Sequence, residues 1–217
     1  GRRMEIALAL AAAVAGLAGG WLALTRIRTG FHRYDTDGPP RALTWVVPVS
    51  ALAAGATAYG LRDWAWPVGV TGAVAAIVGV ALAAIDLDVH RLPRVVTWPC
   101  YPAVALLLTV CSAVTGDWPA LLRALEAGAA LWVLYYVLHR LARRRGLGRG
   151  DVTLAGVVGM LLGWFGWAQV AVATYLAFIL AGASAALLLV LRRVSRSDRI
   201  AFGPAMIAAA LVLLALQ

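Results

Sequence analysis

Residues 66–86 read WPVGVTGAVAAIVGVALAAID, an apolar run that carries no charged side chain before Asp86 at its end. A membrane-spanning α-helix needs about 20 such residues, because the hydrocarbon core of a bilayer is about 30 Å thick. A carboxylate is costly to remove from water, so an aspartate at the end of such a run is more naturally interpreted as chemistry than as packing. The pattern recurs at residues 148–151, GRGD, where Asp151 begins another apolar run. The two aspartates therefore predict an enzyme site in a membrane protein.

The composition agrees with a membrane protein. Of the 217 residues, 63% are hydrophobic and only 13% are charged, which is far from the balance of a soluble domain. The net charge of +9 comes from arginines that lie between the apolar runs. That placement indicates orientation in a bilayer and argues against nucleic-acid binding. No cysteine or histidine cluster has the spacing of zinc ligands, and no nucleotide-binding loop is present, so neither a metal nor a cofactor is predicted.

The apolar runs predict an all-α polytopic membrane protein with about eight transmembrane helices. These helices are expected at residues 5–25, 43–60, 66–86, 95–115, 119–139, 151–168, 170–191 and 200–216. The longest connection, residues 26–42, is too short to hold a folded soluble domain. Residues 1–217 are therefore expected to form a single integral membrane domain, whose motifs lie within about residues 70–217.

The arginines predict how the helices are oriented, because cytoplasmic connections carry the excess of basic residues. The connections after the first, third, fifth and seventh predicted helices each contain several arginines, whereas the opposite connections contain only Arg62. Arg2 and Arg3, near the start of the chain, weigh slightly against this orientation. We expect Asp86 and Asp151 at the cytoplasmic boundary of the membrane. The run of arginines at residues 143–145 is expected to contact anionic lipid headgroups.

The two aspartates lie at helix ends of opposite polarity. Asp151 begins a helix, where the positive end of the helix dipole favours an anion, and Asp86 ends one, where the negative end favours the protonated acid. We hypothesise that Asp151 is the base and Asp86 the acid of a peptide hydrolysis, although close carboxylates titrate as a pair. Gly148 and Gly150 allow a tight bend before Asp151. Pro93 forces the chain to turn after Asp86.

Three stretches, in this order, resemble the motifs of the type IV prepilin peptidases. Residues 86–99, DLDVHRLPRVVTWP, resemble the first aspartate motif, residues 148–151 resemble the GxGD signature, and residues 202–204, FGP, resemble a third element. The resemblance covers about residues 70–217. It implies a membrane aspartyl endopeptidase in which Asp86 and Asp151 are catalytic and Gly148 and Gly150 form the loop that positions the second aspartate.

The resemblance also implies a substrate and a location. Members of the family remove the short basic leader of prepilins and pseudopilins at the cytoplasmic face of a prokaryotic plasma membrane, just before the apolar stem. Bifunctional members carry a cytoplasmic insertion with paired cysteines after the first helix, which is associated with N-methylation. Residues 26–42 are too short for this zinc-binding insertion and contain no cysteine. The implied function is therefore the peptidase without the methyltransferase.

Two departures from the family pattern leave alternatives open. Members commonly have Asn or Asp after the motif proline, where this chain has Arg94, and a basic residue two positions after the second aspartate, where it has Thr153. One alternative is a proton-coupled transporter in which the two aspartates relay ions. Another is a catalytically silent partner in pilus or secretion assembly. The oligomeric state is not indicated by the sequence.

The remaining charged and aromatic residues have structural interpretations. Asp88 points away from Asp86 on a helix and is expected to be solvated, as is His90. Glu126 is a charge inside a predicted span, and its spacing from Arg123 predicts an ion pair between them. Four tryptophans near predicted helix ends are expected to anchor the protein at the membrane interface: Trp45, Trp66, Trp118 and Trp164.

Overall fold

The computed structural model describes residues 2–34, 37, 41–141, 147–191 and 202–217. These residues contain helices and connections without a strand, which confirms the predicted all-α class. The elements are α1 (Arg2–Arg28), α2 (Val46–Gly60), α3 (Trp66–Val89), α4 (Arg94–Thr97), α5 (Cys100–Thr115), α6 (Trp118–Leu141), α7 (Arg149–Gly163), α8 (Trp167–Val190) and α9 (Gly203–Ala215).

Five helical stretches in the described part of the chain are long and apolar enough to cross a membrane. They are Met4–Arg28, Trp66–Val89, Arg94–Thr115, Trp118–Leu141 and Trp167–Val190. Helices α2 and α9 are apolar but shorter, and α7 has 15 residues. Large apolar side chains are exposed along α1, α6 and α8, among them Leu8, Leu22, Val133, Tyr175 and Leu187. Such a surface suits contact with lipid tails, and the protein is a multi-pass membrane protein.

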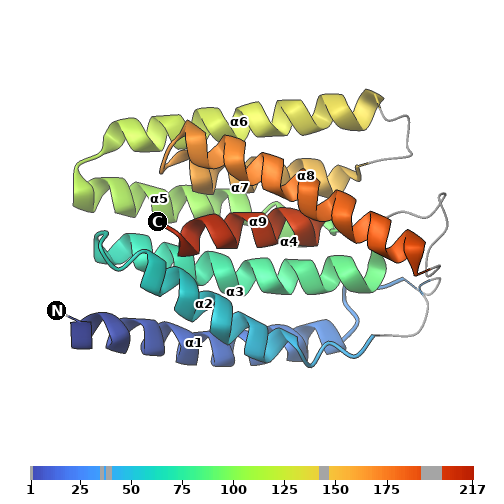
Figure 1. Ribbon diagram of the computed structural model, residues 1–217, viewed down its shortest axis with the longest axis horizontal. Helices are drawn as coiled ribbons and strands as arrows, with labels where there is room; N and C mark the ends of the chain where they lie inside the picture. The colour runs from blue at the N-terminus through green and yellow to red at the C-terminus, as the bar shows by residue number, and fades with distance from the viewer. Residues whose placement is uncertain (1, 35–36, 38–40, 142–146, 192–201) are drawn as a thin grey trace.

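The helices form two groups joined through α5 and α9 (Figure 1). Helices α1, α2 and α3 pack against one another on one side of the molecule, and α6, α7 and α8 on the other. Between them, α9 contacts α2, α3, α7 and α8, while α5 contacts α3, α6 and α7. Every residue of α7 from Asp151 to Gly163 is buried, so this helix is the centre of the second group.

One predicted span contains a turn, and one predicted helix end was wrong. The predicted span at residues 95–115 matches the helical stretch Arg94–Thr115, in which a turn at Trp98 and Pro99 separates α4 from α5. A proline inside a helix removes a backbone donor and clashes with the preceding turn, which favours a break there. The predicted span at residues 151–168 ends at Gly163, because the chain turns before Trp167. In contrast, Pro67 and Pro119 occupy the first turns of their helices, where a missing N–H costs no helical hydrogen bond.

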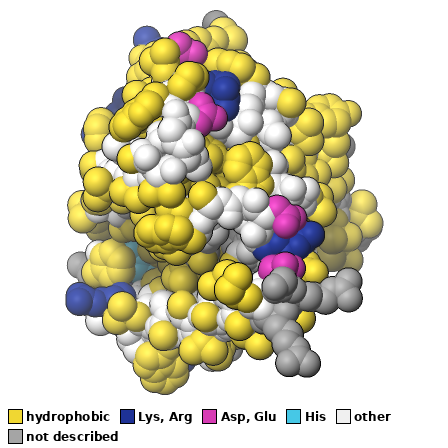
Figure 2. Space-filling model, turned by 90° about the vertical axis from the view of Figure 1, so that its left-hand side faces the viewer, with side chains coloured by type: hydrophobic (Ala, Val, Ile, Leu, Met, Phe, Trp, Pro, Cys, Tyr) yellow, Lys and Arg dark blue, Asp and Glu magenta, His cyan; other side chains and the backbone are white. Residues whose placement is uncertain are grey.

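The two ends of the molecule carry different helix ends and different kinds of side chain. Both chain termini lie at one end, and the last turn of α3 and the first turns of α7 and α9 lie at the other (Figure 1). Figure 2 views the end with the termini, where most side chains are hydrophobic and the charged ones form small groups. At the opposite end lie the last turn of α1 and the chain from the end of α3 to the start of α4, which carry Arg26, Arg28, Arg91 and Arg94. The run at residues 143–145 lies outside the described residues, so its contacts with headgroups stay a prediction.

Two predictions about residues at the end of the molecule that carries the chain termini were also wrong. Arg123 does not pair with Glu126, since its guanidinium donates to the carbonyls of Gly163 and Trp164 at 2.9 and 2.6 Å. It therefore caps the end of α7, while Glu126 is exposed. Trp164 is not an interface anchor, because it is 2% exposed and its indole N–H donates to the Ser112 hydroxyl at 2.9 Å. Trp66 and Trp118 are exposed at helix ends, as an anchor requires.

Candidate active site

Asp86 lies in the last turn of α3, and its side chain is directed at the beginning of α9. The residue is 3% exposed, and its Oδ2 accepts the backbone N–H of Gly203 at 3.1 Å. Helix α3 ends three residues later, where His90 adopts a left-handed conformation with φ of 50° and donates its N–H to the Asp86 carbonyl at 2.8 Å. The side chain of Asp86 thus links two helices that are distant in the sequence.

Asp151 lies in the first turn of α7 and is also buried, at 9% exposure. Its Oδ2 accepts the backbone N–H of Gly148 at 2.8 Å, so the carboxylate caps the helix that carries it. A carboxylate in the first turn of a helix is also favoured by the helix dipole. The GRGD loop therefore fixes the position of the Asp151 side chain through the amide of its own first glycine.

Leu92 connects the surroundings of the two aspartates. A Cβ atom on Gly150 would lie 2.8 Å from Leu92 Cβ and 3.1 Å from its carbonyl oxygen, so only a glycine fits there. A Cβ atom on Gly203 would lie 2.6 Å from Asp86 Oδ2 and 3.4 Å from a methyl group of Leu92. Leu92 thus packs against both Gly150, next to Asp151, and Gly203, next to Asp86. The surroundings of the two aspartates therefore share Leu92 at one end of the bundle.

Two further contacts hold the elements around this point. The His139 Nδ1–H donates to the carbonyl of Leu147 at 2.6 Å and so ties the end of α6 to the residue before Gly148. The Phe202 ring packs against Tyr135 of α6 and Phe178 of α8, with ring centroids 5.8 and 5.1 Å apart. Because Phe202 precedes Gly203, this aromatic cluster fixes the amide that binds Asp86.

An apolar cavity of about 280 Å³ lies between the helices that carry the two aspartates. Its walls come from α3, α5, α7 and α9. They include Leu82, Leu154 and Ile207, which lie about one helical turn from Asp86, Asp151 and Gly203. The arrangement combines two carboxylates at the boundary of a bundle with an adjoining apolar space, which suits a substrate that is polar where it reacts and apolar beyond.

The other residues predicted for the site lie nearby with different contacts. Pro93 precedes α4, and its carbonyl accepts the N–H of Val96 at 3.0 Å, so it begins a short helix after the turn. Arg94 is exposed on α4. Thr153 is buried in α7, its hydroxyl donates to the Arg149 carbonyl at 3.2 Å, and its own carbonyl accepts the Tyr101 hydroxyl at 2.8 Å. Thr153 thus has a packing role, with no charge to offer a substrate.

The prediction that Asp88 is solvated was wrong. Its side chain is 2% exposed and accepts hydrogen bonds from His32, Arg33 and the backbone N–H of Arg41. The error has a physical cause, because these partners are far away in the sequence and helix geometry alone predicts only that Asp88 points away from Asp86. His90 is exposed, as expected.

Gly203 belongs to the FGP stretch, but no role was predicted for it from the sequence. Leu92 and His139 were not predicted to belong to the site. Backbone donors and packing residues leave little signal in a sequence, since many residue types would offer the same amide or the same apolar surface. The ordered position of FGP after the two aspartate motifs was the one available indication. Within the described residues, no group of three or more histidine, cysteine or acidic side chains is placed to hold a metal ion.

Comparison with known proteins agrees with the motifs. The profile of the type IV leader peptidase family matches residues 73–191, more than half of the chain. The chain is 32% identical over 167 residues to a prepilin leader peptidase/N-methyltransferase of Dickeya chrysanthemi, which covers 75% of this chain and 57% of that protein. A protein of the same description from Aeromonas hydrophila is 30% identical over 125 residues, or 58% of this chain and 42% of that protein. The chain thus spans about half the length of these relatives. No solved structure matches it.

Proposed function

This chain belongs to the type IV leader peptidase family, and we propose that it is an aspartyl endopeptidase that cleaves the basic leader of prepilin-like or pseudopilin substrates. The observation that carries the proposal is the junction at Leu92, where the Gly150 and Gly203 backbones bring the surroundings of Asp151 and Asp86 together. Two buried carboxylates whose surroundings share a packing residue support acid and base catalysis of peptide hydrolysis.

In the proposed reaction, Asp151 accepts a proton from a water molecule as its oxygen attacks the scissile carbonyl carbon. Asp86 gives its proton to the carbonyl oxygen. The tetrahedral intermediate then breaks at the C–N bond as Asp151 gives its proton to the leaving amine, and Asp86 recovers a proton from the hydroxyl that becomes the new carbonyl. The assignment follows the helix dipoles, because Asp151 lies at a helix N-terminus and Asp86 at a C-terminus. The Gly203 amide keeps the Asp86 carboxyl group turned toward α9.

The surroundings support a substrate with an apolar stem. The apolar cavity begins about one turn from both aspartates and extends along α3, α5, α7 and α9, where a hydrophobic stem could lie. The scissile bond would then be at the boundary of the bundle. By the positive-inside rule, the arginines in the connections at this end orient the site toward the cytoplasm of a prokaryotic cell, with anionic lipids around it.

We propose peptidase activity without N-methyl transfer. The relatives carry both activities in their names. The connection between α1 and α2 contains no cysteine, so it lacks the paired cysteines associated with methylation. We further propose that residues 1–217 act as one membrane domain.

The test is cleavage of a synthetic prepilin peptide by the purified protein in detergent. Wild type is expected to cut between the leader and the stem, and Asp86→Asn and Asp151→Asn are each expected to be inactive. Asp63→Asn is the matched control, because Asp63 is an exposed carboxylate at the opposite end of the bundle. Cleavage that survives in either site variant would exclude the aspartyl mechanism, and a wild type that cuts nothing would favour an assembly partner.

A further inference from the structure

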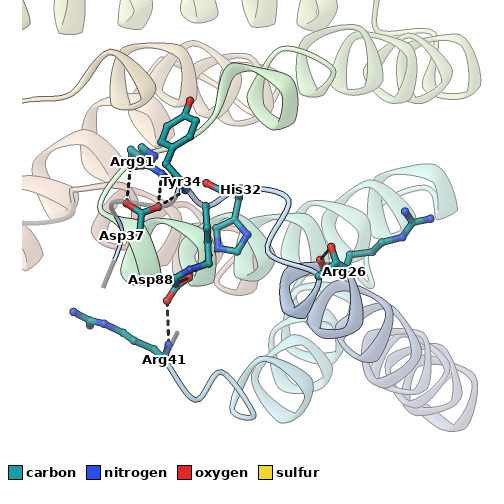
Figure 3. Close-up of polar contacts among 9 residues, drawn as sticks. Arg26, His32, Tyr34, Asp37, Arg41, Asp88 and Arg91 are labelled. Atoms are coloured by element: carbon teal, nitrogen blue, oxygen red, sulfur yellow. Dashed lines mark hydrogen bonds and ion pairs between the residues drawn. The ribbon is translucent and has the colours of Figure 1, made fainter. Parts of the chain in front are cut away.

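The seven residues from Asp86 to Leu92 make two separate sets of contacts. Asp86 and Leu92 face the candidate active site through Gly203 and Gly150. Asp88 and Arg91, which lie between them in the sequence, contact the connection between α1 and α2 instead (Figure 3). The segment that carries a proposed catalytic aspartate is therefore held from two sides.

Asp88 is the first contact with that connection. The His32 Nε2–H donates to its Oδ2 at 2.9 Å, the Arg33 guanidinium binds the same oxygen, and the Arg41 N–H donates to Oδ1 at 3.1 Å. The His32 side chain is fully buried and the Asp88 side chain is 2% exposed. Charge-assisted hydrogen bonds of this kind are about twice as strong as neutral ones, and breaking a buried pair is costly. Asp88 thus joins α3 to the connection at two places, at His32 and Arg33 and again at Arg41.

Arg91 is the second contact. Its guanidinium binds both carboxylate oxygens of Asp37, and its NH1 to Oδ1 distance is 2.9 Å. The same guanidinium lies over the Tyr34 ring at 4.1 Å from the centroid, and the Tyr34 N–H donates to Asp37 at 2.7 Å. The planar fork of an arginine suits such a bidentate and stacked position, which a lysine cannot reproduce.

We propose that Asp88 and Arg91 are positioning residues, which brace the segment 86–92 against the α1–α2 connection and so hold Asp86 and Leu92 in their places in the active site. Asp88 is two residues from Asp86 and lies on another face of the helix, so it acts through the backbone of the last turn of α3. Arg91 precedes Leu92, whose backbone lies against Gly150. A shift of this backbone moves the packing on which both aspartates depend. The inference rests on the proposed function for its kinetic readout.

The sharpest test uses Arg91→Ala, because Arg91 and Asp37 are partly accessible and their loss leaves no fully buried charge. Arg62→Ala is the matched control: Arg62 also stacks on a tyrosine, Tyr59 at 4.5 Å, and pairs with an aspartate, Asp63 at 3.5 Å, but lies at the opposite end of the bundle. Asp88→Ala is less suitable, since it removes the Oδ2 that the Nε2–H of the buried His32 binds, and misfolding could explain its loss of activity.

Arg91→Ala is expected to lower kcat for peptide cleavage about 10-fold and to change KM less than about 2-fold, because it displaces a reacting group and leaves the stem-binding surface intact. Asp37→Ala should give the same loss, and the double variant should lose no more than either single variant, since the two residues act as a pair. Arg91→Lys should fall between wild type and Arg91→Ala. Arg62→Ala should keep the wild-type kcat.

Hydrogen exchange provides a readout that does not depend on cleavage. Amides of residues 86–92 should exchange faster in Arg91→Ala than in wild type or Arg62→Ala. A folded Arg91→Ala variant with the wild-type kcat overturns the proposal. If wild type cleaves no peptide, the proposed function fails, but hydrogen exchange still tests the positioning role of Arg91. Unchanged exchange at residues 86–92 in Arg91→Ala would then overturn that role too.

Discussion

Replacing Gly203 by alanine tests directly whether the backbone of α9 positions a reacting carboxylate. The new Cβ atom would lie 2.6 Å from Asp86 Oδ2, whereas ordinary contacts begin near 3.4 Å. The carboxylate must therefore move by about 0.8 Å, the difference between these two distances. Its hydrogen bond from the Gly203 N–H, 3.1 Å long, is distorted by the same movement.

The structure predicts a large effect on catalysis and a small one on stability. A misplacement of about 1 Å at a reacting group costs on the order of 100-fold in rate, which corresponds to about 2.7 kcal/mol of activation free energy. The atom that must move is the end of a side chain, which can turn away at about 1 kcal/mol by leaving its preferred rotamer. Gly203→Ala should therefore fold with nearly the wild-type thermal stability and cleave about 100-fold more slowly.

The assay compares kcat for a prepilin peptide with the thermal unfolding midpoint in the same detergent. Gly69→Ala is the control, because it makes the same substitution in α3 where a Cβ atom meets no atom within 4 Å. It should keep the wild-type kcat and gain up to about 1 kcal/mol of helix stability. A folded Gly203→Ala variant with wild-type kcat would show that the Asp86 carboxylate does not need the position given by α9.

Two further predictions concern polar contacts outside the site. Arg123→Met removes both donors from the carbonyls at the end of α7 and should destabilise the protein by about 1–3 kcal/mol, whereas Glu126→Gln should be neutral; equal effects in thermal unfolding would instead support an ion pair. The hydrogen bond from Arg91 holds the pKa of Asp37 below its ordinary value of 3.8, and the hydrogen bond from the Tyr34 N–H lowers it further. The resulting stability is present above pH 3.8 and is lost as the pH falls through the lowered pKa, so Asp37→Asn should unfold at a lower temperature than wild type near neutral pH but not in strong acid. A difference that is the same at every pH would contradict this.

Hydrophobic run length was sufficient to predict the helices, because each span needs a fixed number of apolar residues and arginines collect in the connections. It could not predict the break at Pro99 or the early end of α7 at Gly163, since both segments remain apolar through the turn. In a membrane protein, an apolar turn that packs against other helices looks the same in sequence as the helix it interrupts.

The two aspartates could be singled out from sequence, because acidic residues are few in this chain and these two directly adjoin long apolar runs. Their partners could not. Asp88 pairs with residues more than 50 positions away, and Arg123 binds carbonyls about 40 positions away, whereas sequence spacing favours neighbours three or four residues apart. The backbone N–H of Gly203 that binds Asp86 has no side-chain signature at all.

Asp86 and Asp151 are proposed to work as one catalytic unit. The most direct measurement is kcat for peptide cleavage by Asp86→Asn, Asp151→Asn and the double variant, each checked for folding by thermal unfolding. Residues that act as a unit are strongly non-additive, so each single variant should fall to the background rate and the double variant should fall no further. Independent losses that multiply in the double variant, or substantial cleavage by either single variant, would contradict the account.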